Sequence, residues 1–316
     1  MNPYVFIVGC PRSGTTLLRR IIDAHPQIAI TAETHWITKV LDGDDAVDPE
    51  RPVGPELPTR LAGDKRFARM DVDHAALERL FARPEPVSYA EFVSTVFDLY
   101  GRAQGKALVG DKVPGYVRDI AILHDLFPYA RFVHLIRDGR DVCSSALNWE
   151  RRRPSFAKYS TWEEDRVSTL ALWWERRVRA GREAGPPLGP DLYHEMRYEA
   201  LVSEPEEACR ALCDFLDLPF SERILAFHEG HERDDAGLSA KKAWRPITPG
   251  LRSWRTEMSG ADLERFEAAT GALLDELGYA RAVPEPSPAA SEHAARVRAA
   301  FARDAGGRRY PTHGRP

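Results

Sequence analysis

Gly9-Cys10-Pro11-Arg12-Ser13-Gly14-Thr15-Thr16 is the stretch that decides the fold. The apolar run Tyr4 to Val8 before it predicts a buried strand, and the apolar spacing of Thr16 to Ile22 after it predicts a helix. A strand, a glycine loop and a helix in this order open many α/β nucleotide-binding folds. The loop can turn backbone N–H groups and hydroxyl groups toward an anion, at a helix N-terminus where the dipole favours negative charge.

The same loop departs from the Walker A pattern G-x-x-x-x-G-K-[ST], because Thr15 stands where that pattern has its lysine. A P-loop NTPase uses that lysine on the phosphates and a Walker B aspartate for Mg²⁺. Here Arg137, a cation, follows the strongest later strand, Arg131 to Ile136. Both departures favour a phosphate bound without a metal. A P-loop nucleotide kinase or NTPase and a non-catalytic nucleotide-binding protein remain alternatives.

Strand and helix patterns alternate along the rest of the chain. Strands are predicted at Ile28 to Thr31, Ala107 to Asp111, Arg131 to Ile136 and Leu192 to Tyr198. Helices are predicted at 73–83, 89–102, 139–149 and 162–182, and after capping boxes at Ser203 to Glu206 (through Phe215) and Ser259 to Asp262 (to Leu277). This alternation predicts an α/β fold with a P-loop-type central parallel sheet of about five strands flanked by helices.

The predicted organisation is a single domain over residues 1–283 with insertions at about 36–105 and 149–175. Residues 42–64 are rich in Asp, Pro and Gly and predict a loop. Residues 284–316 form a tail rich in Pro, Ala and Arg. The tail is either one amphipathic helix over Ala289 to Ala302 with frayed ends or mostly disordered.

Composition excludes several classes of protein. The chain has 316 residues, 43% of them hydrophobic and 29% charged, as in soluble globular proteins. A net charge of −4 gives no reason to expect a nucleic-acid partner. Apolar runs are shorter than the roughly 20 residues that cross a bilayer. Four scattered cysteines predict no disulfides, and the histidine spacing predicts no metal site. The first ten residues lack a signal-peptide pattern, so we expect a cytoplasmic location.

Two segments carry a resemblance to a known family. Residues 8–18 resemble the 5′-phosphosulfate loop of the sulfotransferases that use 3′-phosphoadenosine-5′-phosphosulfate (PAPS). Residues 131–145 resemble that family's 3′-phosphate segment, an apolar strand followed by Arg and, eight residues later, Ser. Asp23-Ala-His-Pro26, Glu33-Thr34 and Asp111-Lys112 are similar to the tyrosylprotein branch and its bacterial relatives. The resemblance runs weakly through about residues 4–280 and does not cover the tail.

The resemblance implies metal-independent, in-line transfer of a sulfuryl group from PAPS to a hydroxyl group, with 3′-phosphoadenosine-5′-phosphate (PAP) leaving. Residues 1–283 would be the sulfotransferase domain. Glu33 would be the general base, with His35 as the alternative. A carboxylate is a weak base unless its pKa is raised, so we expect Glu33 to be partly buried with a raised pKa. Lys112 would lie on the bridging oxygen or the transferred sulfuryl group, and Arg12 on the 5′-phosphate.

The remaining nucleotide contacts also follow from the resemblance. They are Arg12, Ser13, Gly14, Thr15 and Thr16 in the loop, Arg137 and Ser145 on the 3′-phosphate, Tyr198 beside the nucleotide, and Arg252 and Ser253 in a closing segment. A role for Tyr198 in the core or at a sheet edge is nearly as well supported. We expect a small-molecule, glycan or lipid-linked acceptor rather than a tyrosine of a secreted protein. The two insertions would bind this acceptor, and a homodimer is left open.

Overall fold

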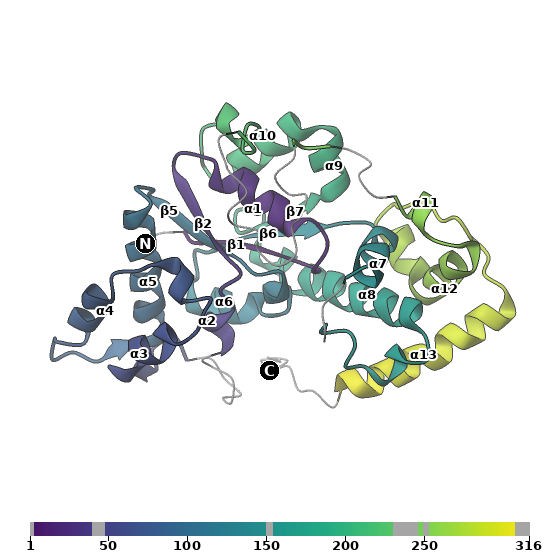
Figure 1. Cartoon of the computed structure of the whole chain (residues 1–316), viewed down its shortest axis with the longest axis horizontal. Helices are drawn as coiled ribbons and strands as arrows, with labels where there is room; N and C mark the ends of the chain where they lie inside the picture. The colour runs from purple at the N-terminus through teal and green to yellow at the C-terminus, as the bar shows by residue number, and fades with distance from the viewer. Residues whose placement is uncertain (1–2, 40–47, 150–153, 230–245, 249–252, 307–316) are drawn as a thin grey trace. The chain divides into compact units, whose positions relative to one another are not determined.

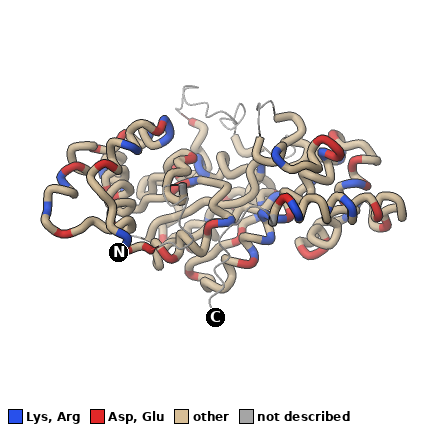
Figure 2. Tube along the Cα trace, turned by 90° about the horizontal axis from the view of Figure 1, so that it is seen from below, with Lys and Arg blue, Asp and Glu red and all other residues tan. Residues whose placement is uncertain are grey.

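The computed structural model describes residues 3–39, 48–149, 154–229, 246–248 and 253–306. The chain forms two compact units. The first comprises Met1–Gly9, Gly14–Leu135 and Gly181–Pro249, and the second comprises Cys10–Ser13, Ile136–Ala180 and Gly250–Pro316. Figure 2 shows Asp and Glu interspersed with Lys and Arg along the described chain, as the small net charge suggests.

A parallel sheet lies at the centre of the first unit (Figure 1). Within the described residues it has five strands in the order β2-β5-β1-β6-β7: β1 (Val5–Gly9), β2 (Ile28–Ala32), β5 (Leu108–Lys112), β6 (Arg131–Ile136) and β7 (Tyr193–Arg197). In the register, Phe6 lies opposite Asp111, and Asp111 lies opposite Thr31. The predicted α/β fold and its strands are confirmed. The strands could be recognised because buried parallel strands appear in the sequence as continuous apolar runs.

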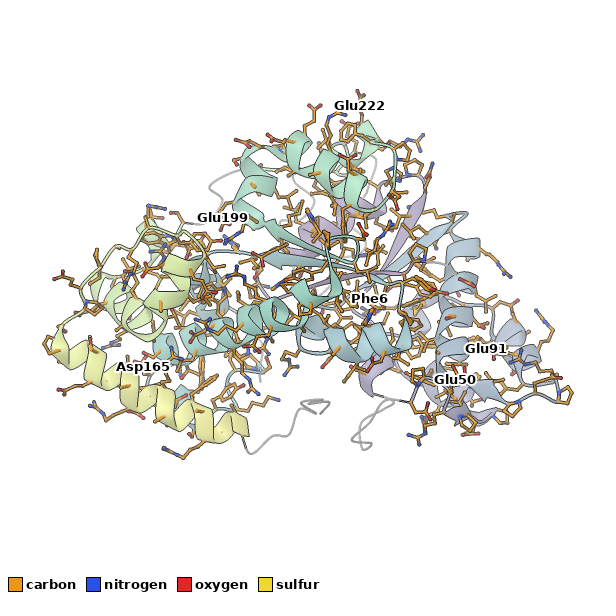
Figure 3. The ribbon with its side chains drawn as sticks, turned by 180° about the vertical axis from the view of Figure 1, so that it is seen from behind. Phe6, Glu50, Glu91, Asp165, Glu199 and Glu222 are labelled. Carbon is orange, nitrogen blue, oxygen red and sulfur yellow. The ribbon has the colours of Figure 1, made fainter. Side chains whose placement is uncertain are left out.

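Side chains alternate between the two faces of the sheet, as the twofold repeat of a strand requires. Phe6, labelled in Figure 3, and Val8 point to one face, where they pack with α5 (Tyr89–Ala103) and α6 (Ile120–Leu126). Val5 and Ile7 point to the other, where they pack with α1 (Thr15–Asp23) and α10 (Pro205–Phe215). With helices on both faces, the carboxyl-terminal edge of the sheet is where open α/β folds place their ligands.

Short elements in the first unit correct two predictions. Residues 42–64 are not a continuous loop in their described part, because α3 (Glu56–Ala62) buries Leu57 and Leu61, four residues apart, in the core. Ser203 does not cap α10, because it is the last residue of α9 (Tyr198–Ser203). The other short elements are α2 (Trp36–Lys39), α4 (His74–Leu80) and the antiparallel pair β3 (Pro52–Val53) and β4 (Val87–Ser88).

Helices build the second unit: α7 (Gly139–Leu147), most of α8 (Arg166–Ala184), α11 (Trp254–Glu257), α12 (Gly260–Glu276) and α13 (Pro288–Gly306). The predicted capping box at Ser259 is present, since its hydroxyl oxygen accepts a hydrogen bond from the Asp262 N–H. The helix predicted from Trp162 begins at Arg166, because the Asp165 carboxylate accepts the Ser168 N–H.

The tail contains helix α13, which matches the helical alternative. Its Ala294, Val297 and Phe301 are buried in the core of the second unit. Asp165, labelled in Figure 3, accepts a 2.8 Å hydrogen bond from His293 of this helix. The domain boundary at residue 283 stays a prediction. In the described part of the chain, each helix is too short or too polar to cross a membrane.

Candidate functional site

Candidate residues follow the strands of the central sheet in the sequence. The glycine loop follows β1, Glu33 comes directly after Ala32 of β2, Lys112 ends β5, Arg137 follows β6, and Tyr198 follows β7. The register of parallel strands brings the ends of β2 and β5 together, because Ala32 lies opposite Lys112. Glu33 and Lys112, which are 79 residues apart in the sequence, therefore meet.

Lys112 connects the Glu33 carboxylate to Thr16 at the end of the glycine loop. Its side chain is 3% exposed, and its Nζ donates a 2.6 Å hydrogen bond to Glu33 Oε1 and a 3.2 Å hydrogen bond to Thr16 Oγ1. Burial lowers the pKa of Lys112 below the ordinary 10.5, although the Glu33 carboxylate opposes this shift. The first unit thus brings three of the predicted residues into one hydrogen-bonded cluster.

Glu33 corrects one prediction. Burial alone would raise its pKa, as expected, but the neighbouring His35 imidazole and the charge and hydrogen bond of Lys112 outweigh burial and hold the pKa below the ordinary 4.5. His35 Nε2 lies 3.7 Å from Glu33 Oε2, and its backbone has a left-handed φ of 59°. His35, the alternative base, is therefore a neighbour of Glu33. In the free protein Glu33 is an ionised carboxylate.

Gly14 and Tyr198 meet in the first unit. Gly14 is the N-cap of α1 with φ 96°, and a Cβ atom there would lie 2.5 Å from the ring of Tyr198. Glycine is required both by this conformation and by this close approach. Gly14 has no side chain that could cap the helix, and the first turn of α1 carries no acidic residue. This helix N-terminus suits an anionic group. Thr15, in the first turn, is buried.

The middle of the loop belongs to the second unit. Arg12 has a left-handed φ of 78°, and its Nε donates a 3.0 Å hydrogen bond to Ser145 Oγ on α7. Its guanidinium lies 5.3 Å from the centroid of the Trp149 ring. Ser13 is fully buried, and its Oγ has no hydrogen-bond partner among the described residues. A buried hydroxyl without a partner is costly unless a ligand satisfies it.

Arg137 and its neighbours form a second group in this unit. Arg137 is 7% exposed, and its Nη2 donates a 3.3 Å hydrogen bond to Asp141 Oδ2. Asp141 Oδ1 accepts the backbone N–H of Trp254 at 2.7 Å, and burial raises the pKa of Asp141. Arg140 forms ion pairs with Asp138 at 2.7 Å and Glu267 at 2.6 Å. This network holds the start of α7, directly after Arg137, which was predicted to bind a phosphate.

Two predicted contacts in the closing segment have different outcomes. Arg252 lies outside the described residues. Ser253 is the N-cap of α11, where its Oγ accepts the Arg255 N–H at 3.3 Å. Sequence reasoning assigned no role to Asp141 or Trp149, and no short-range pattern marks either residue. Among the described residues, no cluster of His, Cys, Asp and Glu side chains could hold a metal ion.

Comparisons with known proteins relate this chain to sulfotransferases. A model of the Sulfotransferase family matches residues 3–222. The protein-tyrosine sulfotransferase of Drosophila melanogaster is 26% identical over 286 residues, which cover 88% of this chain and 52% of the relative. Nodulation protein NoeE of Sinorhizobium fredii is 28% identical over 87% of this chain and 65% of the relative. The chain thus spans about half of the fly relative's length.

A solved structure shows the same fold. The sulfotransferase domain of the Synechococcus PCC 7002 olefin synthase superposes with a TM-score of 0.59, covering 88% of this chain and 95% of that domain at 23% sequence identity. The family model covers well over half of the chain, so this protein belongs to the sulfotransferase family.

Proposed function

We propose that this protein transfers the sulfuryl group of PAPS to a hydroxyl group of an acceptor, with Glu33 as general base. The observation that carries this proposal is the cluster of Glu33, Lys112 and Thr16, joined by hydrogen bonds of 2.6 and 3.2 Å. A carboxylate to accept a proton, a buried cation and a phosphate-type loop are the parts that sulfuryl transfer needs.

The proposed reaction is a single in-line displacement. The acceptor oxygen attacks sulfur, Glu33 takes the hydroxyl proton, and the bond between sulfur and the bridging oxygen breaks. The electron pair leaves on the 5′-phosphate of PAP, where Lys112 stabilises the growing negative charge. The product is the sulfate ester of the acceptor.

The low pKa of Glu33 in the free protein is compatible with this role. Lys112 is one of the groups that lower this pKa. An anionic donor competes with Glu33 for the ammonium group, and loss of that partner raises the pKa of Glu33. Donor binding would therefore make Glu33 a stronger base at the moment when the acceptor must be deprotonated.

Further residues are proposed as phosphate contacts from their own chemistry. Arg12, Ser13 and Ser145 offer a guanidinium and two hydroxyl groups, and Ser13 Oγ lacks a partner among the described residues. Arg137 offers a planar donor for the 3′-phosphate, which distinguishes PAP from nucleotides without that group. Its ion pair with Asp141 would be exchanged for the phosphate.

The acceptor is proposed by class: a small molecule, a glycan or a lipid-linked compound with a free hydroxyl. The name of the fly relative adds a tyrosine side chain as a further candidate. The experiment incubates the protein with ³⁵S-labelled PAPS and a panel consisting of p-nitrophenol, a chitin oligosaccharide, a tyrosine peptide and a cell extract. Labelled product formed by the wild-type protein supports the proposal.

Calorimetry separates this function from its alternatives. We expect PAP to bind without metal and more tightly than ATP–Mg²⁺. Tighter binding of ATP–Mg²⁺ would favour a kinase or NTPase. Binding of PAP without transfer to any member of the panel would favour a non-catalytic nucleotide-binding protein.

A further inference from the structure

Asp111 is a buried carboxylate that the proposed reaction does not use. It lies on β5 immediately before Lys112 and is fully buried. Its Oδ1 accepts a 2.7 Å hydrogen bond from the Thr31 hydroxyl, and its Oδ2 accepts a hydrogen bond from the Thr34 hydroxyl. The Thr34 backbone N–H also donates to this carboxylate. Burying a carboxylate is costly, and burial raises the pKa of Asp111 above the ordinary 3.8, although the hydrogen bonds from Thr31 and Thr34 oppose this shift.

The two threonines lie on either side of Glu33. Thr31 is inside β2, opposite Asp111 in the register, and Thr34 is the residue directly after Glu33. Hydrogen bonds to the Asp111 carboxylate therefore hold the chain both before and after Glu33, the proposed base. The residue that follows, His35, has a left-handed φ of 59°, so the turn departs from ordinary extended backbone. Such a conformation persists where the surrounding contacts hold it.

We propose that Asp111 is a positioning residue that, through Thr31 and Thr34, fixes the backbone at Glu33 and so keeps this carboxylate in the geometry needed to take the acceptor proton. The hydrogen bonds fix the backbone of residues 31–34, and the 2.6 Å contact between Lys112 Nζ and Glu33 Oε1 depends on that backbone. Because Asp111 and Lys112 are adjacent on β5, the end of this strand determines the positions of both the base, Glu33, and the cation, Lys112. This inference rests on the proposed role of Glu33.

The primary test reads the position of Glu33 without any acceptor. Thr34→Val removes one hydroxyl donor and keeps the shape of the side chain. The ¹³C signal of the Glu33 carboxyl group, identified by its loss in Glu33→Gln, is followed against pH. In the wild type we expect Glu33 to stay ionised below the ordinary pKa of 4.5. In Thr34→Val the contact with Lys112 loosens, and the pKa of Glu33 rises toward that value.

Two further variants show whether the effect is specific. Thr270→Val is the matched control, because Thr270 is a buried threonine whose hydroxyl donates to Phe266 O in the second unit. It should leave the Glu33 titration unchanged. Asp111→Asn retains one acceptor oxygen and gains an N–H donor, so it can still bridge both hydroxyls and should keep the pKa of Glu33 low. An unmoved pKa of Glu33 in Thr34→Val would overturn the proposal.

Kinetics on an acceptor from the panel provide the second readout. We expect Thr34→Val to lower kcat by about 10²-fold, the scale of a small misplacement of a reacting group. The KM for PAPS and the affinity for PAP should stay within about twofold of wild type. In a Glu33→Gln background the same substitution should cost nothing further, and a full additional loss would show that Asp111 acts on another group. Absence of transfer by the wild type would refute the proposed function, while the titration would still decide the position of Glu33.

Discussion

Lys112→Met separates a catalytic role of Lys112 from a structural one. Methionine keeps much of the length and volume of the side chain but removes the ammonium group that donates to Glu33 and Thr16. If this group stabilises the charge that develops on the leaving phosphate, kcat should fall by about 10² to 10³, or roughly 2.7–4 kcal/mol, as for the loss of one preorganised donor. Single-turnover transfer from ³⁵S-labelled PAPS measures this loss.

The stability of the same variant should change little. The Glu33 partner is 39% exposed, so solvent screens the pair and its net contribution is about 0–1 kcal/mol. Removing a buried ammonium also relieves its desolvation cost, which is the cause of the lowered pKa of Lys112. Urea unfolding should therefore give a free energy of unfolding within about 1 kcal/mol of wild type. Near-normal kcat would refute the catalytic role, and a stability loss of several kcal/mol would show that Lys112 is structural.

Three further predictions concern other groups of the two units. Arg137→Ala should weaken PAP binding by about 10- to 150-fold, since a charged contact contributes roughly 1.5–3 kcal/mol, and calorimetry with PAP and with AMP measures both affinity and discrimination. Arg140→Met should destabilise the fold by about 3–5 kcal/mol in urea unfolding, because Asp138 and Glu267 lose their buried partner; an unchanged midpoint would contradict this. At alkaline pH, kcat/KM should fall with a midpoint below pH 10.5, because the active form of Lys112 is protonated and burial lowers its pKa. A midpoint that does not move in Lys112→Arg would contradict the assignment.

The strands and the glycine loop could be predicted because both depend on local sequence. The run from Arg131 to Ile136 matches β6 at both ends, since a strand covered on both faces is mostly apolar and its residues after Arg131 are buried. The glycine loop could be recognised because its conformation needs glycine at position 14. Helix α3 was missed because Pro and Asp dominate the composition around it. The helix is short, and its apolar signal is mainly the pair Leu57 and Leu61.

The electrostatics of the site could not be predicted, because they depend on residues distant in the sequence. The pKa of Glu33 is lowered by His35, two residues away, and also by Lys112, which is 79 residues away in the sequence. The contact between Asp141 and the Trp254 N–H joins residues 113 positions apart. Neither the Glu33–Lys112 contact nor the Asp141–Trp254 contact can be read from a short stretch of sequence. The acceptor class, the cytoplasmic location and the Arg252 contact stay predictions.

Sulfuryl transfer by Glu33→Gln tests the central claim most directly. Glutamine keeps the size of the side chain and much of its hydrogen bonding but cannot accept the acceptor proton. General-base catalysis contributes about 10² to 10⁴ in rate, so single-turnover transfer of the ³⁵S label should slow by a factor in that range. Binding of PAP, measured by calorimetry on the same sample, should stay unchanged. Near-normal transfer by Glu33→Gln would contradict the account and would leave His35 as the base to test.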